Sequence, residues 1–223
     1  MVMTLAFQGS LLDGADGAGP GPLGSSVRRT ALRRGAWIDV RPGWIGGADA
    51  LFARLAGAVP WRAEQRRMYD QVVAVPRLVC FYPEEAPLPD PVLDQARQAL
   101  SKHYAAELGE PFLTAGLCLY RDGRDSVAWH GDTIGRGRVE DTMVAIVSLG
   151  APRALLLRPR GGGTALRRNL GHGDLLVMGG SCQRTWLHAI PKTARCLGAR
   201  ISVQFRPDWG NDLGRLTVDA RDA

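Results

Sequence analysis

The stretch Arg200-Ile-Ser-Val-Gln-Phe-Arg206 alternates polar and apolar side chains over its whole length. Side chains of a β-strand point alternately to the two faces of a sheet. The stretch therefore predicts a strand that packs its three apolar side chains on one face. The opposite face carries Arg200 and Arg206 with two neutral polar side chains between them. A polar, basic face of this kind suits an anionic co-substrate, because a guanidinium group grips a carboxylate with two donors.

Further apolar runs lie on the N-terminal side of this stretch, each bounded by glycine, proline or aspartate. Apolar runs that turn residues interrupt at this spacing predict strands. The predicted strands are 113–120, 142–149, 153–158, 174–178 and 184–190, together with 199–205 at the stretch itself. Six or more antiparallel strands that follow a helical segment are typical of an α+β protein with a double-stranded β-helix, which is a jelly-roll or cupin-like barrel, and N-terminal flanking helices.

Two helices and a short strand are predicted ahead of the barrel. The first helix covers 48–59, where four apolar residues recur at helical spacing. The second helix follows Asp90 as N-cap, has Pro91 at its first position and ends at Gly109. Proline suits the first helical position and glycine suits the residue after the last one. The short strand is expected at 36–40.

Composition predicts one principal domain. At 223 residues and 45% hydrophobic, the chain is long enough to bury one sizeable core. Residues 1–35 are expected to be a flexible segment, because 13–27 is rich in glycine, proline and serine. We expect a single domain over 36–223, with an N-terminal helical and recognition part at about 36–111 and the jelly-roll core at about 112–210.

The net charge of +6 comes almost entirely from arginine. This excess favours a nucleic-acid partner, since phosphate contacts dominate nucleic-acid affinity, although an arginine-rich composition in general gives the same excess. No apolar run approaches the roughly 18 residues of a membrane span, so no membrane partner is expected. The N-terminus lacks the basic region of a secretory signal, and the four cysteines are scattered. We expect a monomer with reduced thiols in the cytoplasm.

Three candidate metal ligands stand in the stretches Trp129-His130-Gly131-Asp132 and Trp186-Leu187-His188. Two imidazoles and one carboxylate form the facial triad that leaves coordination positions open on non-haem Fe(II). An H-x-D motif on or just after a strand places both side chains on one face, and His188 on a facing strand would complete the site. Each ligand alone has an ordinary structural explanation, but their order together with the two arginines favours an iron site.

These motifs, in this order, resemble the AlkB family of Fe(II)/2-oxoglutarate-dependent dioxygenases, the nucleic-acid demethylases. The resemblance covers about residues 60–210. The stretches that carry it are Val75-Pro76-Arg77, Leu119-Tyr-Arg-Asp-Gly123, the H-x-D motif, Gly173-Asp-Leu-Leu-Val-Met178, Trp186-Leu-His-Ala-Ile-Pro191 and the strand that ends at Arg206.

The resemblance implies a complete reaction site. By this likeness the Fe(II) ligands are His130, Asp132 and His188. Arg200 and Tyr120 would bind the distal carboxylate of the co-substrate 2-oxoglutarate, and Arg206 would lie nearer its metal end. The implied reaction uses the co-substrate O2, hydroxylates an N-methyl carbon and releases succinate, CO2, formaldehyde and the unmodified base. A base inside a duplex must be flipped out to reach the metal.

Candidate substrate contacts are Arg77, Phe81, Tyr82, Trp129, Arg136 and Arg138. Aromatic rings near the mouth of the barrel could stack on a flipped base, and the arginines could contact phosphates. Core packing for the rings and solvated charge for the arginines are the competing explanations.

Several positions differ from the family pattern. Cys118 and Ser202 stand where the family favours asparagine, and Ile134 stands where repair members carry an acidic residue. The segment between Arg77 and Asp90 is shorter than the nucleotide-recognition lid of those members. Three functions therefore stay open: demethylation of alkylated DNA or RNA bases such as 1-methyladenine or 3-methylcytosine, the same chemistry on modified tRNA, another lesion, a protein or a small molecule, and a non-catalytic nucleic-acid-binding barrel.

Overall fold

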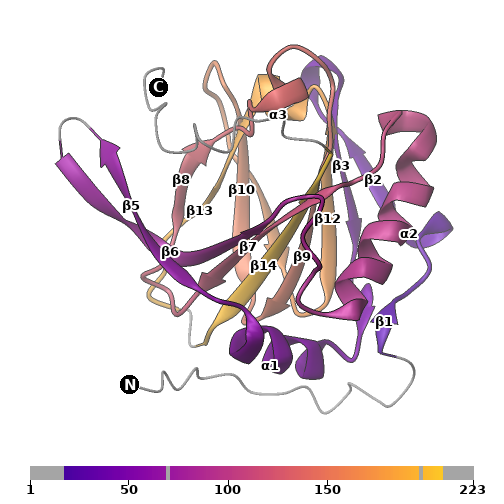
Figure 1. Ribbon diagram of the computed structural model, residues 1–223. Coiled ribbons are helices and arrows are strands. Elements are labelled where there is room, and N and C mark those ends of the chain that lie inside the picture. Colours follow the sequence, from indigo (N-terminus) through magenta and orange to yellow (C-terminus); the bar gives the residue numbers. More distant parts are fainter. Residues whose placement is uncertain (1–17, 69–70, 196–197, 208–223) are drawn as a thin grey trace.

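The computed structural model describes residues 18–68, 71–195 and 198–207, and two antiparallel β-sheets form its centre (Figure 1). The larger sheet consists, in order across it, of β2 (Arg28–Ala31), β3 (Ala36–Arg41), β12 (Asp174–Gly180), β9 (Val144–Gly150), β14 (Arg200–Arg206), β7 (Thr114–Tyr120), β6 (Gln71–Tyr82) and β5 (Arg62–Met68). The smaller sheet consists of β11 (Leu166–Leu170), β10 (Arg153–Pro159), β13 (Trp186–Ile190) and β8 (Val127–His130). A short ribbon pairs β1 (Gly19–Pro20) with β4 (Ile45–Gly46).

The helices are α1 (Ala48–Ala58), α2 (Pro91–Leu108) and the single-turn α3 (Cys182–Thr185), with short 3-10 turns at η1 (Gly24–Ser26), η2 (Arg33–Gly35) and η3 (Gly135–Arg138). Helices α1 and α2 lie on the same face of the larger sheet (Figure 1). Among the described residues no helix is both long and apolar enough to cross a bilayer.

Strand β14 divides the core in two, as its alternating sequence predicts. Ile201, Val203 and Phe205 are fully buried in the core between the larger sheet and the helices. The opposite faces of the same strands meet the smaller sheet, where Tyr120 and Met178 pack with Leu157. Arg200 and Arg206 lie on this inner face, so the polar side of β14 points between the two sheets. We call this inner face the barrel interior.

The predicted fold class is confirmed. The two facing antiparallel sheets form the expected double-stranded β-helix, and the two predicted helices occur within a residue or two of their expected bounds. Helix α2 begins after Asp90, whose side chain accepts the Val92 N–H, and ends at Gly109 in the left-handed conformation.

Five strands outside the N-terminal segment were not predicted as separate elements: the two-residue β4, and β5, β6, β8 and β11. Strands β5 and β11 are rich in charged or polar residues, so neither shows an apolar run. β5 and β6 form a hairpin that extends away from the barrel at the edge of the larger sheet (Figure 1). The element that projects beside the barrel is therefore the β5–β6 hairpin, which ends at Tyr82. The segment 83–89 that follows it is a short turn region.

The expectation of a flexible segment over 1–35 is wrong for residues 18–35, and residues 1–17 lie outside the described residues. Strand β2 pairs with β3, and Arg29 donates from Nε and Nη2 to the buried Asp39 at 2.8 and 2.7 Å. The following turn is held from the other side, because Trp186 Nε1 donates to the Arg33 carbonyl and Ser181 Oγ donates to the Arg34 carbonyl. Gly24 and Gly35 have positive φ in the short turns η1 and η2 of this segment, which explains part of its glycine content.

Replacement of the helix cap tests how α2 is held. Asp90→Ala should lower the free energy of unfolding by about 1–2 kcal/mol, because the buried carboxylate accepts both the Val92 N–H and the Arg54 Nε–H. Asp94→Ala in the same turn is the matched control, and its half-exposed pair with Arg97 should contribute about 0.5 kcal/mol. Urea unfolding followed by circular dichroism gives both values, and equal losses would contradict the assignment of the cap.

Candidate active site

Antiparallel pairing of β8 with β13 brings the two predicted histidine ligands together. His130 and His188 are direct partners in the strand register, and their ring centroids lie 4.1 Å apart. Asp132 follows two residues after His130, just beyond the end of β8. One donor atom from each of the three residues lies within 4.8 Å of the others. The H-x-D motif and the distant histidine therefore form the triad that the sequence predicts.

Hydrogen bonds orient two of the three ligands. His130 Nδ1 lies 2.9 Å from the Ala128 carbonyl, and because a carbonyl can only accept, Nδ1 carries the proton and Nε2 keeps its lone pair. The Asp132 N–H donates to Gln183 Oε1 at 2.9 Å. Arg206 donates to Asp132 Oδ2 from both Nε and Nη2, at 2.8 and 2.7 Å. Oδ1 of Asp132 therefore remains directed toward the histidines, 3.6 Å from His130 Nε2.

The charge states of the triad match a divalent cation. Burial lowers the pKa of His188 to about 3, and burial also lowers the pKa of His130. Burial alone would raise the pKa of Asp132, but the nearby Arg206 and the two histidines outweigh it and hold that pKa below its usual range. Two neutral imidazoles and one carboxylate are the donor set that suits Fe(II) with open coordination positions.

Gly131, the middle residue of the H-x-D motif, is closely packed. A Cβ atom at this position would lie 2.5 Å from the Gln183 carbonyl oxygen and 2.7 Å from Nη2 of Arg160. The Arg160 side chain can move away, but the first contact is with rigid backbone and would force a shift. The approach of the α3 backbone to the metal motif therefore requires glycine between the two ligands, which the H-x-D pattern alone does not reveal.

The second part of the site is a buried pair of one arginine and one tyrosine, Arg200 and Tyr120. Arg200 pairs with Tyr120 across β14 and β7, and its guanidinium carbon lies 5.2 Å from the centroid of the Tyr120 ring. Arg200 is 1% exposed and donates from Nε to Ser148 Oγ at 2.9 Å. Its Nη1 is buried and has no hydrogen-bond partner among the described residues. A buried guanidinium with an unused donor fits a carboxylate ligand, because such a charge is costly without an anion.

Burial sets the protonation of both members of this pair. It raises the pKa of Tyr120 to about 12, so the phenol is a hydrogen-bond donor at neutral pH. It lowers the pKa of Arg200, although a guanidinium stays charged at neutral pH because its ordinary pKa is so high. Tyr120 and Arg200 together can therefore offer several donors to one anionic group.

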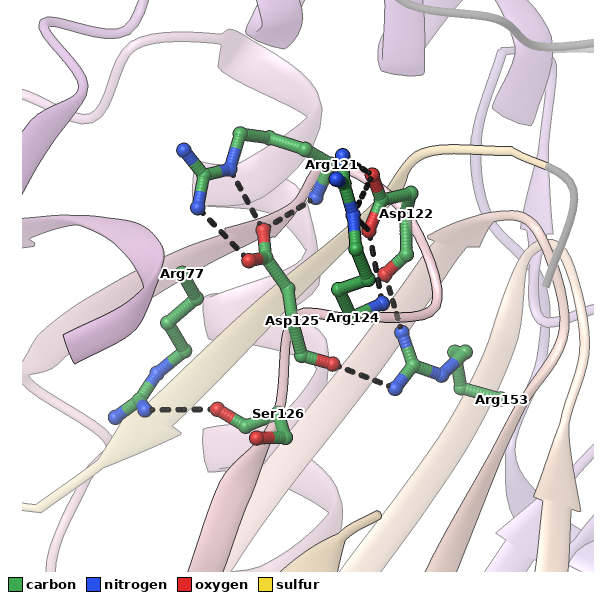
Figure 2. A network of polar contacts seen from close by, with 7 residues as sticks. All are labelled: Arg77, Arg121, Asp122, Arg124, Asp125, Ser126 and Arg153. Atoms are coloured by element: carbon green, nitrogen blue, oxygen red, sulfur yellow. Dashed lines mark hydrogen bonds and ion pairs between the residues drawn. The ribbon is translucent and has the colours of Figure 1, made fainter. Parts of the chain in front are cut away.

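The loop between β7 and β8 is fixed by a polar network (Figure 2). Arg153 is 3% exposed and donates to the carbonyl oxygens of Asp122, Asp125 and Pro191. The Asp125 carboxylate accepts from the Arg121 side chain and backbone. Arg77 Nη1 donates to the Ser126 carbonyl at 3.2 Å. These bonds set the start of β8, the strand that carries His130.

The positions that differ from the family pattern form a small chain along the interior face of β14 and β7. Gln204 Nε2 donates to Ser202 Oγ at 2.7 Å, and Gln204 Oε1 lies 3.8 Å from the Cys118 sulfur. The glutamine thus contacts both residues that replace asparagine. Ile134 lines a small pocket beside Asp132 and Arg206, so a neutral side chain stands in the wall next to the triad.

The six candidate substrate contacts separate into different places. Phe81 is opposite Gly116, which in turn is opposite Gln204, so Phe81 shares the interior face with the site. Tyr82 packs toward the core under the helices, and Trp129, next to His130 in the strand, points to the outer face. On the outer face Trp129 is covered by Arg158, whose guanidinium carbon is 4.4 Å from a ring centroid of the indole. The structure therefore does not bring Tyr82 or Trp129 to the site, because adjacent strand residues point to opposite faces.

The three candidate arginines also differ. Arg136 forms ion pairs with Glu110 and Glu140, which leaves it a poor phosphate ligand. Arg138 is exposed and donates to the Thr133 carbonyl. Arg77 is partly buried and lies in the interior, close enough to act electrostatically on Tyr120 and His130.

Sequence reasoning missed Gln183, Arg153 and Asp125. Gln183 is 1% exposed and bonds the Asp132 backbone, while Arg153 and Asp125 anchor the loop ahead of β8. The alternating charges of the stretch Arg121-Asp-Gly-Arg-Asp125 were the available signal for an ordered loop. No sequence signal marks Gln183, because its partner lies fifty-one positions away in the chain.

Comparisons with known proteins point to one superfamily. A model of the 2OG-Fe(II) oxygenase superfamily matches residues 47–206. Alpha-ketoglutarate-dependent dioxygenase alkB homolog 3 of Bos taurus is 30% identical over 211 residues, which cover 85% of this chain and 71% of that protein. DNA oxidative demethylase ALKBH2 of Arabidopsis thaliana is 31% identical over 133 residues, which cover 49% of this chain and 42% of that protein.

Solved structures share the fold. OsALKBH1 superposes with a TM-score of 0.55 at 15% identity, covering 81% of this chain and 100% of that one. An oxidoreductase of the 2OG-Fe(II) oxygenase family from Burkholderia pseudomallei gives a TM-score of 0.54 at 11% identity, covering 76% of this chain and 84% of that one. At these identities the likeness supports the double-stranded β-helix and nothing finer.

The packing of Gly131 generates a test of the metal site. Gly131→Ala should weaken the affinity for Co(II), used as a stable substitute for Fe(II), by at least about tenfold, because the added methyl group would displace Asp132 from the histidines. Gly161→Ala is the matched control, since a Cβ at Gly161 meets no atom within 4 Å. Optical titration with Co(II) measures both affinities. Equal affinities in the two variants would show that Gly131 has no such function.

Proposed function

The chain belongs to the 2OG-Fe(II) oxygenase superfamily, and within it we propose that the protein oxidatively demethylates alkylated bases of DNA or RNA. The protein is an Fe(II)- and 2-oxoglutarate-dependent dioxygenase, since the superfamily match spans most of the domain and the His-Asp-His triad is present. The choice of substrate is our proposal. The observation that carries it is the likeness to relatives named as alkB homologues and DNA oxidative demethylases.

When bound by the triad, Fe(II) and 2-oxoglutarate supply the O2-dependent oxidation of a substrate carbon, with succinate and CO2 as co-products. The chain's own contribution is to hold its ligands in the required protonation and orientation. Ala128 fixes the tautomer of His130, and Arg206 occupies one oxygen of Asp132 so that the other is available to the metal.

We assign the far end of 2-oxoglutarate to Arg200 and Tyr120. The unused Nη1 donor of Arg200 and the phenol of Tyr120 are both buried on the interior face. A dicarboxylate held there by one end would reach toward the triad with the other. Burial makes this contact strong, because charge-assisted hydrogen bonds gain from a low local dielectric.

A nucleic-acid substrate agrees with the chemistry around the site. The net charge of +6 favours a polyanionic partner. Phe81 on the interior face offers a ring for a flipped base, since stacking on an aromatic ring contributes about 1–3 kcal/mol per base. The same oxidation of another target is the alternative function, and the neutral Ile134 in the wall beside Asp132 is the observation that favours it.

The proposed function is tested with Fe(II)-loaded protein, 2-oxoglutarate, O2 and a single-stranded oligonucleotide that carries one methylated base. We expect succinate formation to rise with the oligonucleotide and to be matched by formaldehyde. His130→Ala should abolish both, and this variant is chosen because the His130 imidazole is neutral at neutral pH, so its loss leaves no buried charge unpaired. Succinate without formaldehyde for any methylated oligonucleotide would direct the search to the alternative function.

The co-substrate assignment has its own test. Arg200→Ala should raise the half-saturating concentration of 2-oxoglutarate at least about a hundredfold, because truncation of one partner of a buried charged pair costs about 3–5 kcal/mol. Arg200→Lys should raise it less, since the charge remains but the planar fork is lost. Succinate formation at varied 2-oxoglutarate gives these values. A half-saturating concentration that does not change in Arg200→Ala would overturn the assignment.

A further inference from the structure

The barrel interior carries more positive than negative charge. The charge effects on Tyr120 and His130 come from the Cys118 thiol, four guanidinium groups and a single carboxylate. The guanidinium groups are those of Arg77, Arg153, Arg200 and Arg206, and the carboxylate is that of Asp132. Asp132 is already engaged by Arg206. Fe(II) and the dianion 2-oxoglutarate cancel in formal charge, so their binding leaves the excess in place.

Arg77 is the member of this group with the least satisfied side chain apart from Arg200. Its Nη1 donates to the Ser126 carbonyl and its side chain also interacts with the Cys118 thiol, whereas its Nε is buried without a hydrogen-bond partner among the described residues. Strand β6 pairs Leu78 with Leu119, so Arg77 stands next to the position of Tyr120 in the sheet. Ser126 is in the loop that leads into β8 and the metal ligands. Arg77 is therefore held between the Tyr120–Arg200 pair and the triad, and Figure 2 shows its side chain reaching the loop.

Among the described residues that line the pocket beside the triad, position 134, where repair members of the family carry an acidic residue, is neutral. The two residues after Asp132 are Thr133 and Ile134, and Ile134 lines the pocket beside the triad. The other residues that line this pocket are neutral except for Asp132 and Arg206. Glu64 on β5 also attracts Arg77, but Glu64 is exposed, so solvent screens its charge.

We propose that Arg77 makes the site selective for alkylated bases that are neutral and carry a carbonyl oxygen at C4 of a pyrimidine or C6 of a purine, beside the methylated nitrogen. This inference rests on the proposed demethylase function and narrows it. 3-Methylthymine and 1-methylguanine have such a carbonyl and no net charge. 1-Methyladenine and 3-methylcytosine are cations at neutral pH and carry an amino group at that carbon, which donates hydrogen bonds and cannot accept one from a guanidinium.

Two physical effects act in the same direction. A carbonyl oxygen of the base accepts a charge-assisted hydrogen bond from Arg77, which is stronger than a bond between neutral groups. A cationic base, by contrast, enters an interior with excess positive charge and a low dielectric, where repulsion is larger than in water. Discrimination by one buried donor that is left unpaired is typically large, whereas discrimination by an added methyl group is small.

The test compares four single-stranded oligonucleotides of one sequence, each with one of these lesions. We expect kcat/KM for formaldehyde release to be at least about tenfold higher for the two neutral lesions than for the two cationic ones. Binding to Mn(II)-loaded protein with 2-oxoglutarate, measured anaerobically by fluorescence anisotropy, should rank the lesions in the same order without any turnover. Arg77→Gln should remove most of the preference in both measurements, and Arg77→Lys should keep part of it.

Two further variants separate charge from folding. Arg158→Gln removes a guanidinium on the outer face, where it stacks on Trp129, and should leave the preference unchanged. Ile134→Glu adds a carboxylate beside Asp132 and should raise kcat/KM for the cationic lesions, a gain that a misfolded protein cannot show.

The possible outcomes separate the selectivity of Arg77 from the demethylase function. Demethylation of cationic lesions at rates equal to or above those of the neutral ones, with a ratio that Arg77→Gln does not change, would overturn the selectivity and leave the demethylase function standing. Failure to release formaldehyde from any of the four lesions, with succinate unaffected by the oligonucleotides, would overturn the proposed function and the selectivity with it.

Discussion

The ion pair between Arg206 and Asp132 joins the two sheets at the point where chemistry is expected. Arg206 belongs to β14 of the larger sheet, and Asp132 follows β8 of the smaller one. Both side chains are more than nine-tenths buried, so neither charge can return to water when the other is missing. Because both donors of Arg206 bond Oδ2 of Asp132, the carboxylate is fixed while its Oδ1 stays available to a metal ion. The contact that closes the barrel is therefore also the contact that orients a metal ligand.

The rest of the interior extends this arrangement along one strand. Arg200, Ser202, Gln204 and Arg206 share the inner face of β14, while the alternate residues fill the core under α1 and α2. One strand thus satisfies the hydrophobic requirement of the fold on one side and builds the polar site on the other. This explains how a site with several buried guanidinium groups can exist, because the apolar side of the same strand stabilises the sheet that holds them.

Local sequence signals predicted the parts of the structure that depend on local physics. The alternation of 200–206 and the caps of α2 at Asp90 and Gly109 are properties of a few adjacent residues, and they occur as expected. The triad was predictable because its chemistry restricts residue type and order. Tyr82 and Trp129 were assigned to the site, but the direction of a strand residue depends on register, which a single strand does not reveal. Gln183 and Arg153 act only through distant backbone partners, so their functions appear only in three dimensions.

The turn at Arg33 and Arg34 affects where the domain can be said to begin. Composition places the boundary near residue 36, after the glycine-rich stretch. The carbonyl oxygens of Arg33 and Arg34 nevertheless accept from Trp186 and Ser181, which flank α3 and lead into the strand of His188. A truncated protein that started at residue 36 would leave the Trp186 and Ser181 donors without these partners and would expose β3 as a new sheet edge. The smallest fragment that retains this support for His188 therefore includes β2 and the turn after it.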